Sequence, residues 1–339
     1  MEIEFEHGFG AHCENVVTTS LLRYYGYNYS EPMVFGLSAS LYFVHLPFMK
    51  SLGFPMTAFR PFPGVIFARV TQKLGFKIKK RMFLSKKRGA KKLDDLMEKG
   101  IPTGCVTSMY HLPYLPAEYR YHFNVHNVCV IGKEDDNYLI SDPIATEKVT
   151  ISSKDLLRAR FAKGPFPQSG KIYWVKSVPK KEPDMNKLLR KAILKNCFRM
   201  VHQPGPMPFI GVNAFKYLGN KLPDFPKVYG EKRAAQHLVY LFRTMEEMGT
   251  GGAGFRFLYA AFLQEAAEVT GISELNDFSK RLTDIGDQWR VFATDAGRIF
   301  KNRTSENVNY QTLGDLLKEI GKMERQFFID LEKVIKKWK

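Results

Sequence analysis

The stretch EHGFGAHCENVVTTSLLRYYG, residues Glu6 to Gly26, places a cysteine at the start of a predicted amphipathic helix. Apolar side chains follow Cys13 at helical spacing, and Gly26 stands where a helix usually ends. The N–H groups and the positive dipole end of a helix's first turn favour a thiolate, the nucleophilic form of cysteine. Cys13 is therefore the candidate nucleophile. The alternative is that Cys13 only packs in the core, because free cysteine is among the most buried residue types.

Two short β-rich segments, VHNVCVIG and NYLISDP, are separated by the polar turn KEDD and predict an antiparallel hairpin. If Ile131 pairs with Tyr138, His126 and Asp142 come close together at the end of the hairpin away from the turn. The carboxylate could then fix the tautomer of the imidazole and leave its other nitrogen for a thiol. Cysteine first, histidine far downstream and acid last is the chain order of papain-like folds.

The length of 339 residues predicts two domains. The pattern of the sequence changes at a proline- and charge-rich hinge, residues 179–187. Helix and strand signals are mixed before the hinge, whereas helical patterns dominate after it. We expect an α+β domain over residues 1–180 and an all-helical domain over residues 184–339.

Three blocks of the sequence resemble one family. Residues 10–43, which begin GAHCENVV, and residues 100–143, which end NYLISDP, are similar to the butirosin biosynthesis protein H N-terminal family. GGAGFRFLYAAFLQEAAE, residues 251–268, resembles the helical domain that usually follows. The resemblance implies a papain-like domain with an antiparallel sheet and a helical domain that covers the substrate cleft. It implies that Cys13 is the nucleophile, His126 the base and Asp142 the acid that orients the histidine.

The named member of this family is an acyltransferase that moves an acyl group from a carrier-protein thioester to an amine. The resemblance thus implies transfer through an acyl-cysteine intermediate to an amine or hydroxyl, in natural-product biosynthesis that includes aryl-polyene pigments and other lipophilic esters or amides. The phosphopantetheine arm of the carrier protein would be part of the substrate, and no permanently bound cofactor is expected. Hydrolysis of a peptide or amide by the same three residues, and a catalytically silent binding protein, are the alternatives. The acyl chain, the acceptor and the oligomeric state stay open.

Further side chains are candidates for the surroundings of the site. His7 stands six residues before the cysteine, where papain-like enzymes usually carry glutamine, so it and the Cys13 backbone N–H are the candidate oxyanion donors. His12 and His122 are candidates for contacts that support the catalytic residues, and the candidate substrate-binding residues are Glu31, His111 and Arg256. The spacing of histidine and cysteine matches no common zinc ligand set, so no metal site is expected.

The formal net charge of the chain is +17, and Lys77–Lys92 holds nine Lys or Arg and no acid. Such a run attracts an anionic partner, unless it is only a solvated face. No nucleic-acid-binding motif accompanies it, which leaves an acidic carrier protein, or a lipid headgroup in a peripheral membrane contact. The expected docking residues are Lys79, Lys80, Arg81, Lys86, Lys87 and Arg88.

The first residues, MEIEFEHGFG, lack the basic and apolar regions of a signal peptide. The four cysteines are scattered without paired spacing, which is typical of a reducing compartment. We therefore expect a cytoplasmic protein.

Overall fold

The computed structural model describes residues 2–164, 166–202 and 207–338, and the chain divides into two compact units. The first unit comprises Met1–Val34 and Pro63–Pro183, and the second comprises Phe35–Phe62 and Asp184–Lys339. The division after Pro183 falls inside the predicted hinge. The second unit, however, also takes Phe35–Phe62, which the sequence analysis assigns to the first domain.

The first unit is built on a six-stranded sheet in the order β3-β8-β4-β5-β6-β7, in which every pair of neighbours is antiparallel. The strands, taken across the sheet, are β3 (Lys77–Arg81), β8 (Ile172–Ser177), β4 (Thr103–Thr107), β5 (His126–Glu134), β6 (Asn137–Ser141) and β7 (Val149–Ser152). The predicted antiparallel α+β domain is confirmed.

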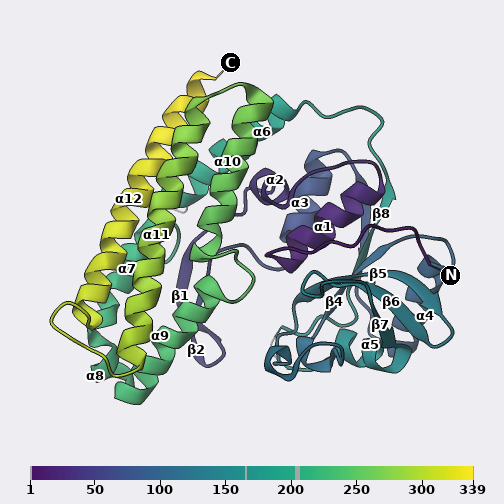
Figure 1. Ribbon diagram of the computed structural model, residues 1–339, viewed down its shortest axis with the longest axis horizontal. Helices are drawn as coiled ribbons and strands as arrows, with labels where there is room; N and C mark the ends of the chain where they lie inside the picture. The colour runs from purple at the N-terminus through teal and green to yellow at the C-terminus, as the bar shows by residue number, and fades with distance from the viewer. Residues whose placement is uncertain (1, 165, 203–206, 339) are drawn as a thin grey trace. The chain divides into compact units, whose positions relative to one another are not determined.

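Helices cover both faces of this sheet. Figure 1 shows α1 (Cys13–Tyr24) and α3 (Val65–Lys73) on one side, and α4 (Lys86–Met97) and α5 (Ser153–Arg160) on the other. The central strands β4 and β5 are buried because both of their faces are covered, and their apolar residues form the core with α1 and α4. α1 packs on β5, which brings the start of the helix to the start of the strand that carries His126.

The register of the β5–β6 hairpin differs from the predicted one. Tyr138 pairs with Lys133 rather than with Ile131, and the register shifts between Val130 and Gly132. The bulge places one extra residue in β5, and its position depends on packing that the alternation of residues does not encode. In the observed register, His126 is therefore further along β5 from the position opposite Asp142 than in the predicted register.

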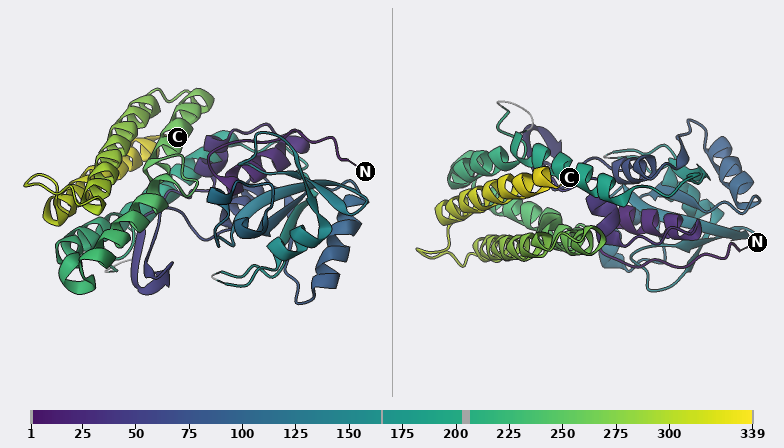
Figure 2. Two further views of the ribbon diagram at one scale, coloured as in Figure 1. Left: turned by 60° about the horizontal axis from the view of Figure 1, so that its bottom comes forward. Right: turned by 90° about the horizontal axis from the view of Figure 1, so that it is seen from above.

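The second unit confirms the helical character of the C-terminal half. Figures 1 and 2 show its longer helices running side by side. Its helices are α6 (Met185–Cys197), which continues into a π-helical turn η3 (Phe198–His202), α7 (Val212–Lys221), α8 (Phe225–Tyr229), α9 (Glu231–Glu246), α10 (Arg256–Thr270), α11 (Glu274–Phe300) and α12 (Tyr310–Lys337). Within the residues described, none of the helices has the length and apolarity needed to cross a bilayer.

The segment 35–62 joins this unit because its aromatic side chains complete the helical core. Phe35 stacks on Phe255 with 4.8 Å between ring centroids, and Phe43 stacks on Phe215 at 4.4 Å and approaches Trp289 at 5.7 Å. The segment also forms an antiparallel hairpin, β1 (Val44–Ser51) and β2 (Phe54–Ala58). This hairpin was not predicted.

Candidate active site

Cys13 is the first residue of α1, and the loop before it is held in place by a carboxylate. The backbone N–H groups of Ala11 and His12 donate to the two oxygens of Glu31 at 3.0 and 2.8 Å. Burial raises the pKa of Glu31, although these two hydrogen bonds and one from Asn15 oppose the rise. Glu31 is the first residue of α2 (Glu31–Leu37). Glu31 was predicted to bind substrate, but its two carboxylate oxygens accept hydrogen bonds from the backbone that leads into Cys13.

His12 also serves the helix that begins at Cys13. It is the N-cap residue of α1, and its Nδ1 accepts a hydrogen bond from the N–H of Asn15 at 3.3 Å. Such a cap satisfies one of the N–H groups that have no partner within the helix. His12 therefore lies directly before the candidate nucleophile, and its observed contact holds the first turn of the helix.

A second buried carboxylate, which the sequence analysis missed, ties α1 to α3. Glu14 is fully buried and accepts hydrogen bonds from the N–H groups of Ile66 and Phe67 at 2.9 and 3.3 Å. Those N–H groups lie at the start of α3, where a negative charge also interacts favourably with the helix dipole. The signal available in the sequence is an acid directly after the cysteine, as the single acidic residue of the helix.

His126 and Asp142 lie in direct contact, and His126 also contacts Cys13. The Nε2 atom of His126 is 2.9 and 3.0 Å from the two carboxylate oxygens of Asp142. This leaves Nδ1 as the nitrogen that can bond to the Cys13 sulfur, with which His126 shares a hydrogen bond. The structure thus brings together the three residues to which the sequence analysis assigns the chemistry. In the first unit a cysteine at the start of a helix therefore lies beside a histidine on an antiparallel sheet.

Electrostatics favour a charged imidazole in this group. Burial opposes the charge on His126, but the attraction and hydrogen bond of Asp142, together with the hydrogen bond and charge of Cys13, raise its pKa to about 10. Burial would raise the pKa of Asp142, yet the charge and hydrogen bond of His126 and two further donors lower it. A protonated imidazole beside an ionised carboxylate is therefore the favoured charge state of His126 and Asp142.

The two further donors to Asp142 come from loops. The hydroxyl of Tyr114 donates to Oδ2 at 2.7 Å, and the N–H of Ile144 donates to Oδ1 at 3.0 Å. Burial, then the charge of Asp142 and this hydrogen bond, raise the pKa of Tyr114 well above its usual value, so the phenol stays a donor. Tyr114 lies between β4 and β5, and the sequence pattern contains no signal that pairs it with Asp142 across 28 positions.

His7 is not placed to act as an oxyanion donor. Its Nε2 lies 2.9 Å from the carbonyl oxygen of Ala145 and its Nδ1 lies 2.9 Å from the hydroxyl of Ser141. A carbonyl can only accept, so Nε2 carries the proton and Nδ1 accepts from Ser141. Both ring nitrogens are therefore engaged by residues that flank Asp142, and His7 steadies that segment. The backbone N–H of Cys13 remains the other expected oxyanion donor.

His111 and His122 lie together in the connection between β4 and β5. The exposed ring of His122 stacks on Tyr110 with 4.1 Å between centroids, and His111 meets the edge of Tyr110 at 5.1 Å. Burial, Arg158 and His122 lower the pKa of His111. The contacts described for these two histidines are with one another and their neighbours, and not with Cys13, His126 or Asp142.

The expected substrate role of Arg256 is wrong. The residue is fully buried in the second unit, and its Nε and Nη2 donate to the two oxygens of Glu324 at 2.8 and 2.9 Å. Its Nη1 donates to the carbonyl of Gly254, and the indole N–H of Trp289 also donates to Glu324, at 2.9 Å. All three nitrogens of the guanidinium donate to protein oxygens and the side chain is fully buried, so Arg256 acts as a structural ion-pair partner of Glu324.

The predicted docking residues gather at one edge of the sheet. Strand β3 forms that edge, and the connection to α4 runs directly from it. The Lys80 ammonium donates to the carbonyl of Gly64 at 3.0 Å. Among the residues described, none of the six cations pairs with a carboxylate, and two exposed apolar side chains, Met82 and Leu84, stand between them. All six are exposed: Lys79, Lys80, Arg81, Lys86, Lys87 and Arg88.

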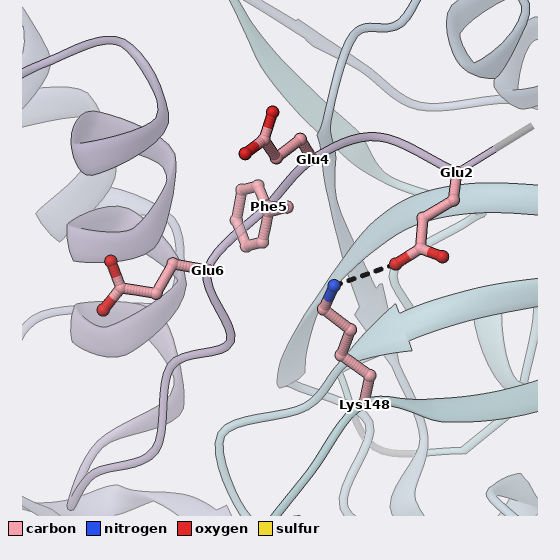
Figure 3. Close-up of a pocket in the computed structure, with 5 residues that line it drawn as sticks. All are labelled: Glu2, Glu4, Phe5, Glu6 and Lys148. Carbon is pink, nitrogen blue, oxygen red and sulfur yellow. Dashed lines mark hydrogen bonds and ion pairs between the residues drawn. The ribbon is translucent and has the colours of Figure 1, made fainter.

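A hollow elsewhere on the first unit is unrelated to the cysteine. Figure 3 shows Glu2, Glu4, Phe5, Glu6 and Lys148 around it, with Glu2 and Lys148 paired at 2.9 Å. Across residues 2–164, 166–202 and 207–338, no group of three or more His, Cys, Asp or Glu side chains is arranged to hold a metal ion.

Comparisons with known proteins add to this geometry. Residues 12–143 match the family Butirosin biosynthesis protein H, N-terminal, and residues 154–331 match Domain of unknown function (DUF4872). A comparison with curated proteins found no match.

Two solved structures show a distant likeness. The peptidase domain of Streptococcus ComA, a bi-functional ABC transporter involved in a quorum-sensing pathway, is 16% identical over 51% of this chain and 98% of its own, with a TM-score of 0.33. A Bacillus anthracis protein described as a C39-like peptidase is 17% identical over 52% of this chain and 92% of its own, also with a TM-score of 0.33.

The second of the two family matches spans more than half of the 339 residues, and the first contains Cys13, His126 and Asp142. The chain therefore belongs to the family of Domain of unknown function (DUF4872), and its residues 12–143 are similar to the family Butirosin biosynthesis protein H, N-terminal.

Proposed function

We propose that the protein is an acyltransferase in which Cys13 carries the acyl group between a thioester donor and an amine or hydroxyl acceptor. The observation that carries the proposal is the continuous contact of Cys13, His126 and Asp142. A sulfur beside an imidazolium, which is in turn held by a buried carboxylate, is the arrangement that activates a cysteine for nucleophilic catalysis.

The proposed reaction has two steps. In the first, the Cys13 thiolate attacks the carbonyl carbon of the thioester, and the donor thiol departs with the proton of the His126 imidazolium. The acyl group is then bonded to the Cys13 sulfur. In the second, an amine or hydroxyl attacks this carbonyl and gives its proton to His126, and the thiolate is released. Asp142 keeps Nε2 engaged throughout, so that Nδ1 faces the reacting atoms.

The donor that we propose is an acyl thioester on the phosphopantetheine arm of an acyl carrier protein. Carrier proteins are acidic, and six exposed cations without carboxylate partners lie along β3 and the start of α4 in the described part of the chain. Opposite charges of this kind raise the rate of association and orient the two proteins as they meet, and salt weakens this attraction. The family match supports a natural-product pathway. We propose a lipophilic ester or amide as the product. A thiolate nucleophile and scattered free cysteines suit the reducing cytoplasm.

The test is intact-protein mass spectrometry after mixing the protein with an acyl-carrier thioester. The native chain should gain the mass of one acyl group, Cys13→Ala should gain none, and Cys197→Ala, which removes a buried thiol of the second unit, should match the native chain. An adduct on Cys13→Ala, or no adduct on the native chain, would contradict the proposal.

Hydrolysis uses the same acyl-cysteine intermediate, so a second measurement separates it from transfer. Adding an amine or alcohol to the acylated protein should convert the acyl group into an amide or ester faster than into the free acid. If the free acid accumulates whatever acceptor is supplied, water is the acceptor and the protein is a hydrolase.

A further inference from the structure

The residue that follows His126 is an asparagine in the middle of the sheet, which is an unusual place for it. Asn127 is fully buried in β5, and asparagine is depleted in strands because it neither packs well there nor favours extended backbone. A residue that breaks a local rule in an otherwise consistent element is often explained by a functional site.

Three contacts account for the polar atoms of the Asn127 amide. Its Nδ2 lies 3.7 Å from the Cys13 sulfur and 3.1 Å from the carbonyl oxygen of Val125, and its Oδ1 accepts from the hydroxyl of Tyr173 at 2.9 Å. The Val125 carbonyl can only accept a hydrogen bond, so the group that faces it must be the NH₂ group. One N–H is then directed at Val125, and the other is directed at the sulfur.

Tyr173 locks this orientation from the neighbouring part of the sheet. Its ring crosses Gly104, where a Cβ atom would lie 2.2 Å from the ring, and it packs against Phe67 with 4.5 Å between centroids. Burial, then the charges of Glu14 and nearby cysteines, raise the pKa of Tyr173 well above its usual value. The phenol therefore stays protonated and keeps Oδ1 turned away from the sulfur.

We propose that Asn127 is a second hydrogen-bond donor to the Cys13 sulfur, beside His126, and that it stabilises the thiolate over the thiol. An N–H bonds more strongly to an anionic acceptor than to a neutral one, so such a donor favours the charged form. The inference rests on the proposed role of Cys13 as nucleophile. It adds that the reactivity of Cys13 is set from two sides: by the histidine that moves the proton, and by an amide that does not titrate.

The test is the pH dependence of Cys13 alkylation by iodoacetamide, followed by intact mass. Cys105, Cys129 and Cys197 are buried, so alkylation reports on Cys13, with Cys13→Ala as the blank. Asn127→Leu should raise the midpoint of the alkylation profile by about one pH unit, and slow alkylation about tenfold below the midpoint, because a hydrogen bond to a charged group is lost. Asn196→Leu, which removes another fully buried amide but in the second unit, should leave the midpoint unchanged.

Two further variants keep the inference testable if Asn127→Leu does not fold. Asn127→Ala removes the donor without adding bulk, and Tyr173→Phe keeps the buried ring but frees the amide, so its midpoint should rise by about half a pH unit. If folded variants at both positions keep the native midpoint, Asn127 has no influence on the thiolate and the inference is wrong. The comparison needs no acyl donor, so its failure is distinct from a failure to form the acyl adduct in the test above.

Discussion

The Nε2 atom of His126 lies 2.9 Å from the Oδ1 atom of Asp142, and both side chains are buried. Asp142 thereby occupies the nitrogen that faces away from Cys13, so the imidazole has one nitrogen left for the sulfur. The contact holds together the group on which the proposed acyl transfer depends.

Replacing Asp142 by asparagine should slow acylation of Cys13. Burial disfavours the charged imidazole, and the carboxylate is the main opposing influence, so the pKa of His126 should fall in Asp142→Asn. Loss of an orienting carboxylate of this kind can lower rates by factors on the order of 10⁴. Single-turnover acylation over pH 5–10 should show a lower rate and an upper pH limit displaced to lower pH. An unchanged profile would mean that Asp142 does not govern the charge of His126.

The stabilisation that His126 contributes to the fold should depend on pH. Its pKa is raised to about 10 in the native protein, against about 6.5 in an unfolded chain. The contribution is therefore complete below about pH 6.5 and is lost as the pH rises through 10. The difference in melting temperature between the native protein and His126→Gln should narrow over this range. A difference that stays constant between about pH 6.5 and pH 10 would show that the imidazole is neutral in the folded state.

Removing the Tyr114 hydroxyl should weaken the site without disturbing the fold. Tyr114→Phe deletes a 2.7 Å hydrogen bond to the Asp142 carboxylate, and hydrogen bonds to charged groups contribute about 1.5–3 kcal/mol. We expect acylation to slow by about tenfold, because Asp142 loses a hydrogen bond that orients its carboxylate and favours its charged form. Tyr119→Phe, which alters an exposed tyrosine of the same connection, is the matched control and should have no effect.

Reversing the charge of the β3 and α4 cations should affect only donors that are carried on a protein. The triple variant Lys79→Glu, Arg81→Glu and Lys86→Glu should raise the KM for an acyl-carrier donor at low salt, with kcat nearly unchanged. The rate with a small soluble thioester should stay at the native level. Lys301→Glu with Arg303→Glu, which alters exposed cations of the second unit, provides the control. An equal loss of activity with the carrier-protein donor and with the small thioester would show that these residues do not act by docking the carrier protein.

Arg256 should prove important for stability and not for the reactivity of Cys13. Deleting one partner of a buried ion pair leaves an uncompensated charge and costs about 3–5 kcal/mol, so Arg256→Met should lower the free energy of unfolding by about that amount. The double variant Arg256→Met with Glu324→Leu should recover part of the loss. Cys13 alkylation in the folded fraction should be unchanged. Selective loss of acyl transfer, with native stability, would restore the substrate role that the buried geometry contradicts.

Local patterns in the sequence determined much of this protein. Three patterns each lie within short windows of the chain: the helical periodicity after Cys13, the alternating segments that contain His126 and Asp142, and the helical patterns beyond the hinge at residues 179–187. Helix and strand formation respond to such windows, so these elements could be predicted, whereas the grouping of Cys13 with His126 and Asp142 was implied by the family resemblance. The boundaries of the β5–β6 pairing could not, because the bulge beyond Val130 depends on packing.

Only the tertiary structure decided which partners the polar side chains take. His7 bonds to Ser141 and Ala145 rather than facing the cysteine, Glu31 binds the backbone before Cys13, and Arg256 pairs with Glu324. These partners are separated by 19 to 138 positions, and no local pattern ties one to the other. A buried polar atom takes whichever partner the packed chain brings within hydrogen-bond distance, because leaving it without one costs free energy.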